Sequence, residues 1–194
     1  MFSLESYDAA GLAARAEIYD RIVLYLHASD RRQWELMEMV FHDDAIWNMS
    51  SIGGSTWRDT LNFTQKLFAE HLLTTHHQIG NVMIRVNGDR ALTEIYCTAY
   101  HRVRADAPTG GIFGGIGHEY DLVGGLRYFD KFERRDGSWR ITERRGISDW
   151  RHLQPAADGI LSQVNPQFRG TRDGNDPSLP IVEDWLNVAK GTAA

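Results

Sequence analysis

The first third of the chain places apolar residues at helical spacing. Residues 9–27 predict an amphipathic helix, because apolar side chains recur every three or four positions at Leu12, Ala16, Tyr19, Ile22, Val23 and Leu26. A second, shorter helix is predicted over 31–41, and a third from its cap Asp59 to about Leu72. Residues 45–50, between the second and third helices, predict a strand.

From residue 79 onward the pattern changes to the alternation that is typical of strands. Alternating apolar residues predict four strands, at 79–86, 91–103, 122–135 and 138–150. Asn87-Gly88-Asp89-Arg90 and Asp136-Gly137 are hairpin turns that join these strands in pairs. His101 falls on the apolar face of the second strand by parity. Residues 104–121 are rich in glycine and predict a loop.

This order of elements favours the α+β class. Helices come first and antiparallel hairpins follow, so we expect a cone-shaped, curved antiparallel sheet with the helices on its concave face, enclosing a pocket. The predicted domain covers residues 1–154. Four of the five prolines lie in 155–194, which predicts an extension or arm with one short helix near 181–188.

Composition narrows the class of partner and the compartment. The 194 residues carry a formal net charge of −5, which gives no electrostatic reason to expect nucleic acid. Cys97 is the only cysteine, so an intrachain disulfide is excluded and a reducing, cytoplasmic setting is expected. Neither a secretory signal nor a run long enough to span a membrane is visible.

The residues that point to chemistry are a histidine and an aspartate far apart in the chain. His77 lies where a helical stretch gives way to a strand, and Asp30 follows the first predicted helix. A histidine oriented by a carboxylate is a general base near neutral pH. Alternatively, Asp30-x-x-Gln33 fits a capping box for the second helix, worth about 1 kcal/mol without any catalytic role.

Parity leaves the choice of histidine open. On a straight strand His76, rather than His77, shares a face with Val82 and Ile84. A bulge at Gly80 would reset the register and turn His77 inward instead.

Other candidate sites are weaker. Glu70-His71 and His76-His77 lack the spacing of known metal motifs, and Gly110-Gly111-Ile112-Phe113-Gly114-Gly115 lacks the lysine and the strand–helix context of a phosphate loop. We therefore predict no metal and no cofactor, and interpret the glycine run as a flap over the pocket.

Several segments together resemble a known family, the SnoaL-like branch of the nuclear-transport-factor-2-like superfamily. This branch includes scytalone dehydratase, bile-acid 7α-dehydratase and hexachlorocyclohexane dehydrochlorinase. The resemblance covers roughly residues 10–150. It is carried by Ala28-Ser29-Asp30-Arg31-Arg32, His42-Asp43-Asp44-Ala45-Ile46-Trp47, His77-Gln78-Ile79-Gly80-Asn81 and Tyr128-Phe129-Asp130-Lys131-Phe132-Glu133-Arg134-Arg135-Asp136-Gly137-Ser138-Trp139.

The resemblance implies roles for five residues. It pairs Asp30 with His77 as a catalytic dyad, makes Tyr25 a hydroxyl donor and makes Arg144 the group that stabilises a departing anion. His101 resembles a second pocket histidine. The residues alone leave other readings open: a core tyrosine, a core histidine, an arginine in a surface ion pair, and Arg145 rather than Arg144 facing inward.

Aromatic side chains would complete the binding site. Trp47, Phe63 and Tyr96 are predicted to contact the substrate, although they, like Trp57, equally fit a core position.

The resemblance implies a cofactor-independent lyase, most simply a dehydratase, acting on a small cyclic apolar substrate. The alternatives are an isomerase or polyketide cyclase that uses the same dyad, and a non-catalytic ligand-binding or oxygenase small-subunit-like module. The resemblance also implies a homo-oligomer, either a dimer or a trimer, with no nucleic-acid or membrane partner.

Overall fold

The computed structural model describes residues 8–49, 53–157 and 159–181. The chain separates into two compact units, Met1–Pro155 and Ala156–Ala194. The second unit contains the 3-10 helices η2 (Gly159–Gln163) and η3 (Pro166–Phe168) and a helical turn over 178–181. Most of the helix expected near 181–188 lies outside the described residues. No helix in the described ranges is long and apolar enough to cross a membrane.

Helix α1 (Ala9–Arg31) presents a different stripe to the core from the one expected. Asp8 caps it by accepting a hydrogen bond from the Gly11 amide at 2.7 Å. Leu12, Tyr19 and Val23 are exposed. The buried positions are Ala14, Ile18, Ile22, Tyr25, Leu26, Ala28, Ser29 and Asp30. Both stripes have helical spacing, so the apolar pattern could not decide which one faces the sheet.

Two further helical elements frame the first strands. The second predicted helix is the 3-10 helix η1 (Trp34–Met39), and Gln33 at its N-cap makes no side-chain capping bond. Helix α2 (Trp57–His71) is capped by Thr56, which accepts from the Asp59 amide at 3.2 Å. The expected cap Asp59 instead lies inside the first turn, where its carboxylate accepts from the Thr56 hydroxyl at 2.7 Å.

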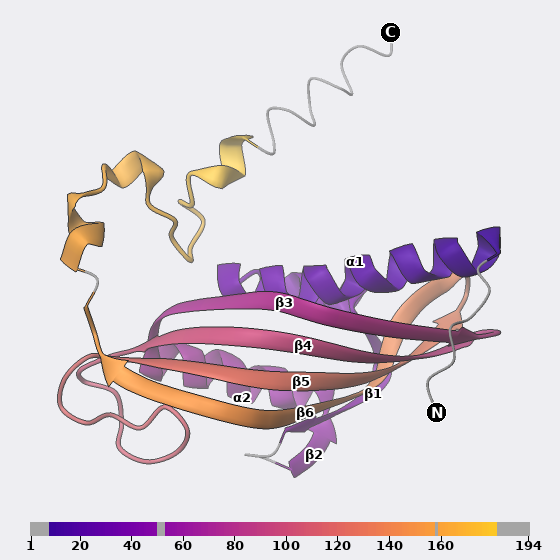
Figure 1. Ribbon diagram of the computed structural model, residues 1–194, viewed down its shortest axis with the longest axis horizontal. Helices are drawn as coiled ribbons and strands as arrows, with labels where there is room; N and C mark the ends of the chain where they lie inside the picture. The colour runs from indigo at the N-terminus through magenta and orange to yellow at the C-terminus, as the bar shows by residue number, and fades with distance from the viewer. Residues whose placement is uncertain (1–7, 50–52, 158, 182–194) are drawn as a thin grey trace, which may run out of the picture. The chain divides into compact units, whose positions relative to one another are not determined.

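The sheet has six strands in the order β2-β1-β6-β5-β4-β3. Every neighbouring pair is antiparallel except β1 with β6, so the α+β prediction is confirmed with one parallel pair added. Helix α1 runs beside β3, the third strand in sequence order (Figure 1). The strands are β1 (Phe41–Met49), β2 (Gly53–Thr56), β3 (Leu72–Asn87), β4 (Arg90–Val103), β5 (Tyr120–Arg135) and β6 (Ser138–Pro155).

Interruptions in strand pairing decide which side chains face the helices. The β3–β4 register shifts between Ile79 and Val82, where Gly80 and Asn81 together oppose Tyr96, and this one extra residue resets the alternation. On the last hairpin the register shifts again, because Lys131 and Phe132 pair with Glu143 and Ile141. This second shift turns Arg144 inward in place of Arg145.

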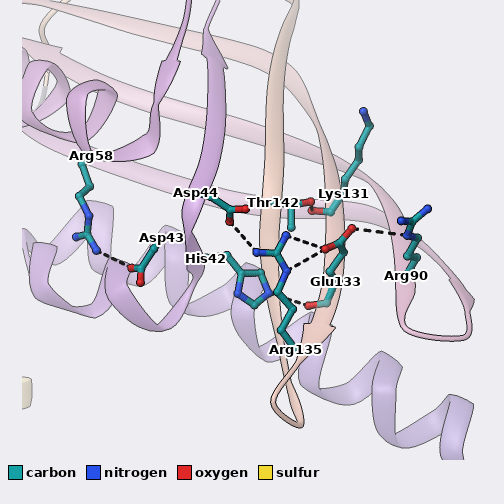
Figure 2. A network of polar contacts seen from close by, with 9 residues as sticks. All are labelled: His42, Asp43, Asp44, Arg58, Arg90, Lys131, Glu133, Arg135 and Thr142. Atoms are coloured by element: carbon teal, nitrogen blue, oxygen red, sulfur yellow. Dashed lines mark hydrogen bonds and ion pairs between the residues drawn. The ribbon is translucent and has the colours of Figure 1, made fainter.

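A polar network fastens the start of β1 to the β5–β6 hairpin (Figure 2). The His42 ring donates from Nε2 to the Glu133 carbonyl at 2.9 Å, and Arg135 bridges Asp44 at 2.8 Å and the Glu133 carboxylate at 2.7 Å. The pairing of β1 with β6 is interrupted between Phe41 and Ile46. These side-chain contacts therefore span the stretch where the backbone ladder is broken.

The deepest polar contact in the sheet is the ion pair between Asp130 on β5 and Arg144 on β6. Both side chains are fully buried, and Arg144 donates from Nε and Nη2 to the two carboxylate oxygens at 2.7 and 2.6 Å. Burial alone would lower the pKa of Arg144, but the charge and hydrogen bonds of Asp130 outweigh burial and raise it. The guanidinium therefore keeps its positive charge, and the Asp130 carboxylate balances that charge.

Removing one partner of this pair should be costly. We expect Arg144→Met to lower the free energy of unfolding by about 3–5 kcal/mol, because it leaves the Asp130 carboxylate buried and unpaired. The double variant Asp130→Leu/Arg144→Met should recover most of that loss. Urea denaturation measures both values.

Arg145→Met is the matched control, since that side chain is exposed, and it should change stability by less than about 0.5 kcal/mol. Equal stability of Arg144→Met and Arg145→Met would show that the buried pair is unimportant.

Candidate functional site

A cavity of about 130 Å³ lies in the first unit, far larger than the roughly 10–15 Å³ that one water molecule requires. Helices α1 and α2, strands β1 and β3–β6 and the loop 104–119 all contribute to its wall. The lining residues are Tyr25, Ser29, Trp47, Met49, Thr64, Leu67, Phe68, His77, Ala99, His101, Ile112, Phe113, Leu122, Gly124, Gly125, Leu126, Tyr128, Gly146, Ile147, Ser148, Trp150 and Arg151.

Asp30 and His77 meet at this wall, as the sequence predicts. The carboxylate Oδ1 lies 2.7 Å from the His77 ring nitrogen Nδ1, and Oδ2 accepts from the His77 backbone N–H at 2.8 Å. The two side chains are only 10% and 7% exposed. Because a carboxylate at this site accepts, Nδ1 carries the proton and Nε2 is left as the basic nitrogen.

The environment keeps Asp30 ionised. Burial by itself would raise the pKa of Asp30, but hydrogen bonds from the His77 ring, its backbone amide and Thr75, with the His77 charge, lower it below the usual 3.8. The carboxylate can therefore fix the ring orientation and stabilise an imidazolium.

The capping-box interpretation of Asp30 is wrong. Helix α1 continues through Arg31, so Asp30 belongs to its last turn, and both of its oxygens bond to His77. His76 is exposed, and the one-residue bulge at Gly80 and Asn81 explains why His77 takes the inward position.

His101 on β4 is the second histidine of the cavity. Its ring centroid lies 5.5 Å from that of His77, at a nearly perpendicular angle. Burial, followed by the charge of His77, lowers the pKa of His101 to about 3, so the ring is neutral at physiological pH. Among the described residues, its buried Nδ1 has no hydrogen-bond partner. His101 therefore offers the cavity a neutral polar group.

Aromatic rings form one side of the cavity, with Arg144 behind them. Tyr25 packs edge-on against Trp47 and Tyr128 at centroid distances of 5.6 and 5.8 Å. Burial raises the pKa of Tyr25 against the opposing charge of Arg144, so the phenol keeps its proton. Arg144 lies 3.7 Å from the Tyr25 ring centroid and is not in the cavity wall. The structure thus places Arg144 outside the cavity wall, enclosed by Asp130 and the rings of Tyr25 and Tyr128, and its role toward a departing anion stays a prediction.

The structure places two predicted substrate contacts outside this cavity. Tyr96 is 41% exposed and outside the cavity, because even-numbered residues of β4 point away from the face that carries His101. Phe63 is 43% exposed, since the inward positions of α2 are one residue on, at Thr64, and at Phe68. Trp47 lines the cavity as expected, whereas Trp57 is buried in the core outside it.

The glycine-rich loop closes one end of the cavity. Ile112 and Phe113 lie in its wall. His71, at the end of α2, donates from Nδ1 to the Phe113 carbonyl at 2.8 Å, which anchors the loop. His71 thus has a structural partner, and the described ranges contain no cluster of three His, Cys, Asp or Glu side chains suited to a metal.

Sequence reasoning missed most of the wall, and two of the missed residues are Tyr128 and Arg151. Tyr128 shares strand parity with the buried Phe132, so its inward position could have been found. Arg151 lies one residue beyond the predicted end of the last strand, which in the structure continues to Pro155. No signal in the sequence separates it from the other arginines of that strand.

The match to a family model agrees with this architecture. Residues 10–145 match the model of the SnoaL-like domain, and the protein belongs to that family. The uncharacterised protein Rv2910c of Mycobacterium tuberculosis is 27% identical over 143 residues, which cover 70% of this chain and 85% of that protein.

Solved structures share the fold. Hexachlorocyclohexane dehydrochlorinase (LinA) type 2 superimposes with a TM-score of 0.65 at 21% identity, covering 77% of this chain and 97% of that one. A protein of Novosphingobium aromaticivorans assigned as a scytalone dehydratase gives 0.60 at 20% identity, covering 75% and 91%. An NTF2-like superfamily protein of Salmonella enterica gives 0.58 at 16% identity, covering 77% and 96%. The fold is therefore NTF2-like and related to that of dehydrochlorinases and dehydratases.

The lowered pKa of His101 predicts a pH dependence of stability. Between pH 6.5 and about 3 the unfolded chain binds a proton at this ring and the folded chain does not, so stability falls as the pH falls. The contribution is at most about 1.4 kcal/mol per pH unit. We expect His101→Phe to lack it, as measured by urea denaturation across this range.

His118 is exposed, and His118→Gln should keep the wild-type pH dependence. A difference between wild type and His101→Phe that stays constant with pH would contradict a neutral, buried His101.

Proposed function

We propose that this protein is a cofactor-independent lyase, a dehydratase, that acts on a small cyclic substrate with an apolar ring. The observation that carries the proposal is the 2.7 Å contact between Asp30 and His77 at the wall of a largely apolar cavity. Low polarity around a base strengthens its electrostatic interactions, and a fixed tautomer directs one nitrogen at the substrate.

The proposed reaction removes a proton and a hydroxyl from adjacent positions of the ring. His77 Nε2 takes the proton next to an activating carbonyl, and Asp30 stabilises the imidazolium that forms. The electrons of the broken C–H bond form the new double bond as the C–O bond breaks. His77 then returns the proton to the departing hydroxide, so water leaves and the enzyme is regenerated.

Tyr25 is the proposed donor to the developing oxyanion, because its phenol lines the cavity and keeps its proton. His101 supplies a second neutral polar contact. The structural neighbours include a dehydrochlorinase and a protein assigned as a scytalone dehydratase. This supports the proposed elimination without assigning a substrate to the chain.

The test is turnover of a panel of cyclic β-hydroxy ketones, followed by mass spectrometry. Loss of one water identifies elimination, whereas an unchanged mass with a new retention time identifies the isomerase or cyclase alternative. Recovery of every compound unaltered, although bound, would favour the non-catalytic module.

His77→Gln should lower kcat/KM by about 10²–10⁴-fold, the usual contribution of a general base, while the fold is retained by circular dichroism. His76→Gln is the matched control, since that neighbouring imidazole is exposed. Wild-type turnover by His77→Gln would refute the base assignment.

We also propose that the chain forms a homo-oligomer through the sheet. Leu92 and Phe129 line a groove together with Lys131, Glu143, Arg145 and Ile147, and Leu92 is exposed. Burying such apolar surface stabilises association. Light scattering should report a dimer or trimer that Leu92→Asp weakens, and a monomeric wild type would contradict it.

A further inference from the structure

The wall of the cavity contains one permanent charge among the described residues. Apart from Arg151, the lining side chains are apolar, aromatic, hydroxyl-bearing or imidazole, and none is Asp, Glu or Lys. Arg144, which packs behind the tyrosine rings of the wall, is neutralised by Asp130 and lies outside the wall. Arg151 is therefore the side chain that sets the electrostatic character of the cavity.

Arg151 is placed by the backbone of the neighbouring strand. It pairs with Gly124 on β5, and a Cβ at Gly124 would lie 3.6 Å from Arg151 Cγ. The missing side chain at Gly124 thus leaves a surface on which the arginine stem can lie. In the described ranges, the last pair between β1 and β6 joins Asn48 to Arg145. Arg151 lies further along β6, on an edge that β1 does not cover.

The guanidinium has no acidic partner within the described part of the chain. Its Nη2 donates to the Ser148 hydroxyl at 3.0 Å, and no ion pair joins it to a carboxylate. Arg127, three pairs away on β5, shows the contrast, because it is held by Glu94 and Asp149 at 2.9 Å each. Arg151 therefore keeps donors available for a ligand.

Arg151 lies at the mouth of the cavity. It is exposed and yet belongs to the wall, as Ser148 and Trp150 do. Its charge also reaches the interior: after burial and the charge of His77, Arg151 contributes to the lowered pKa of His101. A negative group at the mouth would thus be within the electrostatic reach of His101.

We propose that Arg151 binds a carboxylate attached to the apolar ring of the substrate and so orients the ring toward His77. The planar guanidinium matches a carboxylate through paired hydrogen bonds. Ser148, which accepts from Arg151, keeps its own hydrogen to donate to the same group. This inference rests on the proposed function for the chemistry at His77. It concerns binding at the mouth of the cavity, however, and can fail while the proposed function holds.

The test compares two ligands of the same shape, 2-naphthoate and its uncharged amide, 2-naphthamide, by isothermal titration calorimetry. Wild type should bind the carboxylate about two- to fivefold more tightly, the size expected for a partly exposed charge pair. Arg151→Gln should remove this preference and leave amide binding unchanged. Arg151→Lys should keep part of it, because it retains the charge without the fork geometry.

Arg145→Gln is the matched control, an exposed arginine of the same strand outside the cavity wall, and should keep the wild-type preference. His77→Gln should also keep it while losing turnover, which separates the two proposals. The inference is overturned if wild type does not prefer naphthoate, or if Arg151→Gln still does. A third outcome also overturns the inference: Arg151→Gln still prefers naphthoate but turns over an uncharged substrate more slowly than wild type. In that case Arg151 would act on the departing anion and not on a substrate carboxylate.

Discussion

The bond between the Asp30 carboxylate and His77 joins the end of α1 to the beginning of β3. Both carboxylate oxygens are used, one on the ring and one on the backbone amide of the same residue. Such a two-point contact fixes the ring, its tautomer and the approach of helix to strand together. The place of His77 in the cavity wall and the proposed direction of proton transfer both depend on this alignment.

Shifts in strand register decide which other side chains of the sheet face inward. The one-residue bulge at Gly80 and Asn81 places His77 inside while Val82 and Ile84 still face the core. A similar shift opposite Lys131 and Phe132 brings Arg144 inward. Bulges of this kind re-aim a side chain without moving a strand, which is why they recur beside functional sites.

The arginines of β6 show how position in the tertiary structure assigns different roles to one residue type. Arg144 is enclosed by Asp130 and two tyrosine rings and serves the stability of the sheet. Arg145 is exposed on the opposite face. Arg151, at the open edge of the strand, has only a hydroxyl partner among the described residues and lies in the cavity wall. The charge that the cavity offers a ligand therefore comes from its mouth.

The sequence by itself determined the α+β class and the two hairpins, because periodicity and turn residues are local properties. The resemblance of short motifs implied the pairing of Asp30 with His77, and strand parity placed His101 on an apolar face. Only the tertiary structure decided between His76 and His77 and between Arg144 and Arg145, since both choices depend on bulges that form between strands. It also decided that Leu12, Tyr19 and Val23 face outward, and that Tyr96 and Phe63 lie outside the cavity. Strand pairing and helix rotation about the sheet depend on contacts between distant segments, and local apolar spacing is compatible with more than one of them.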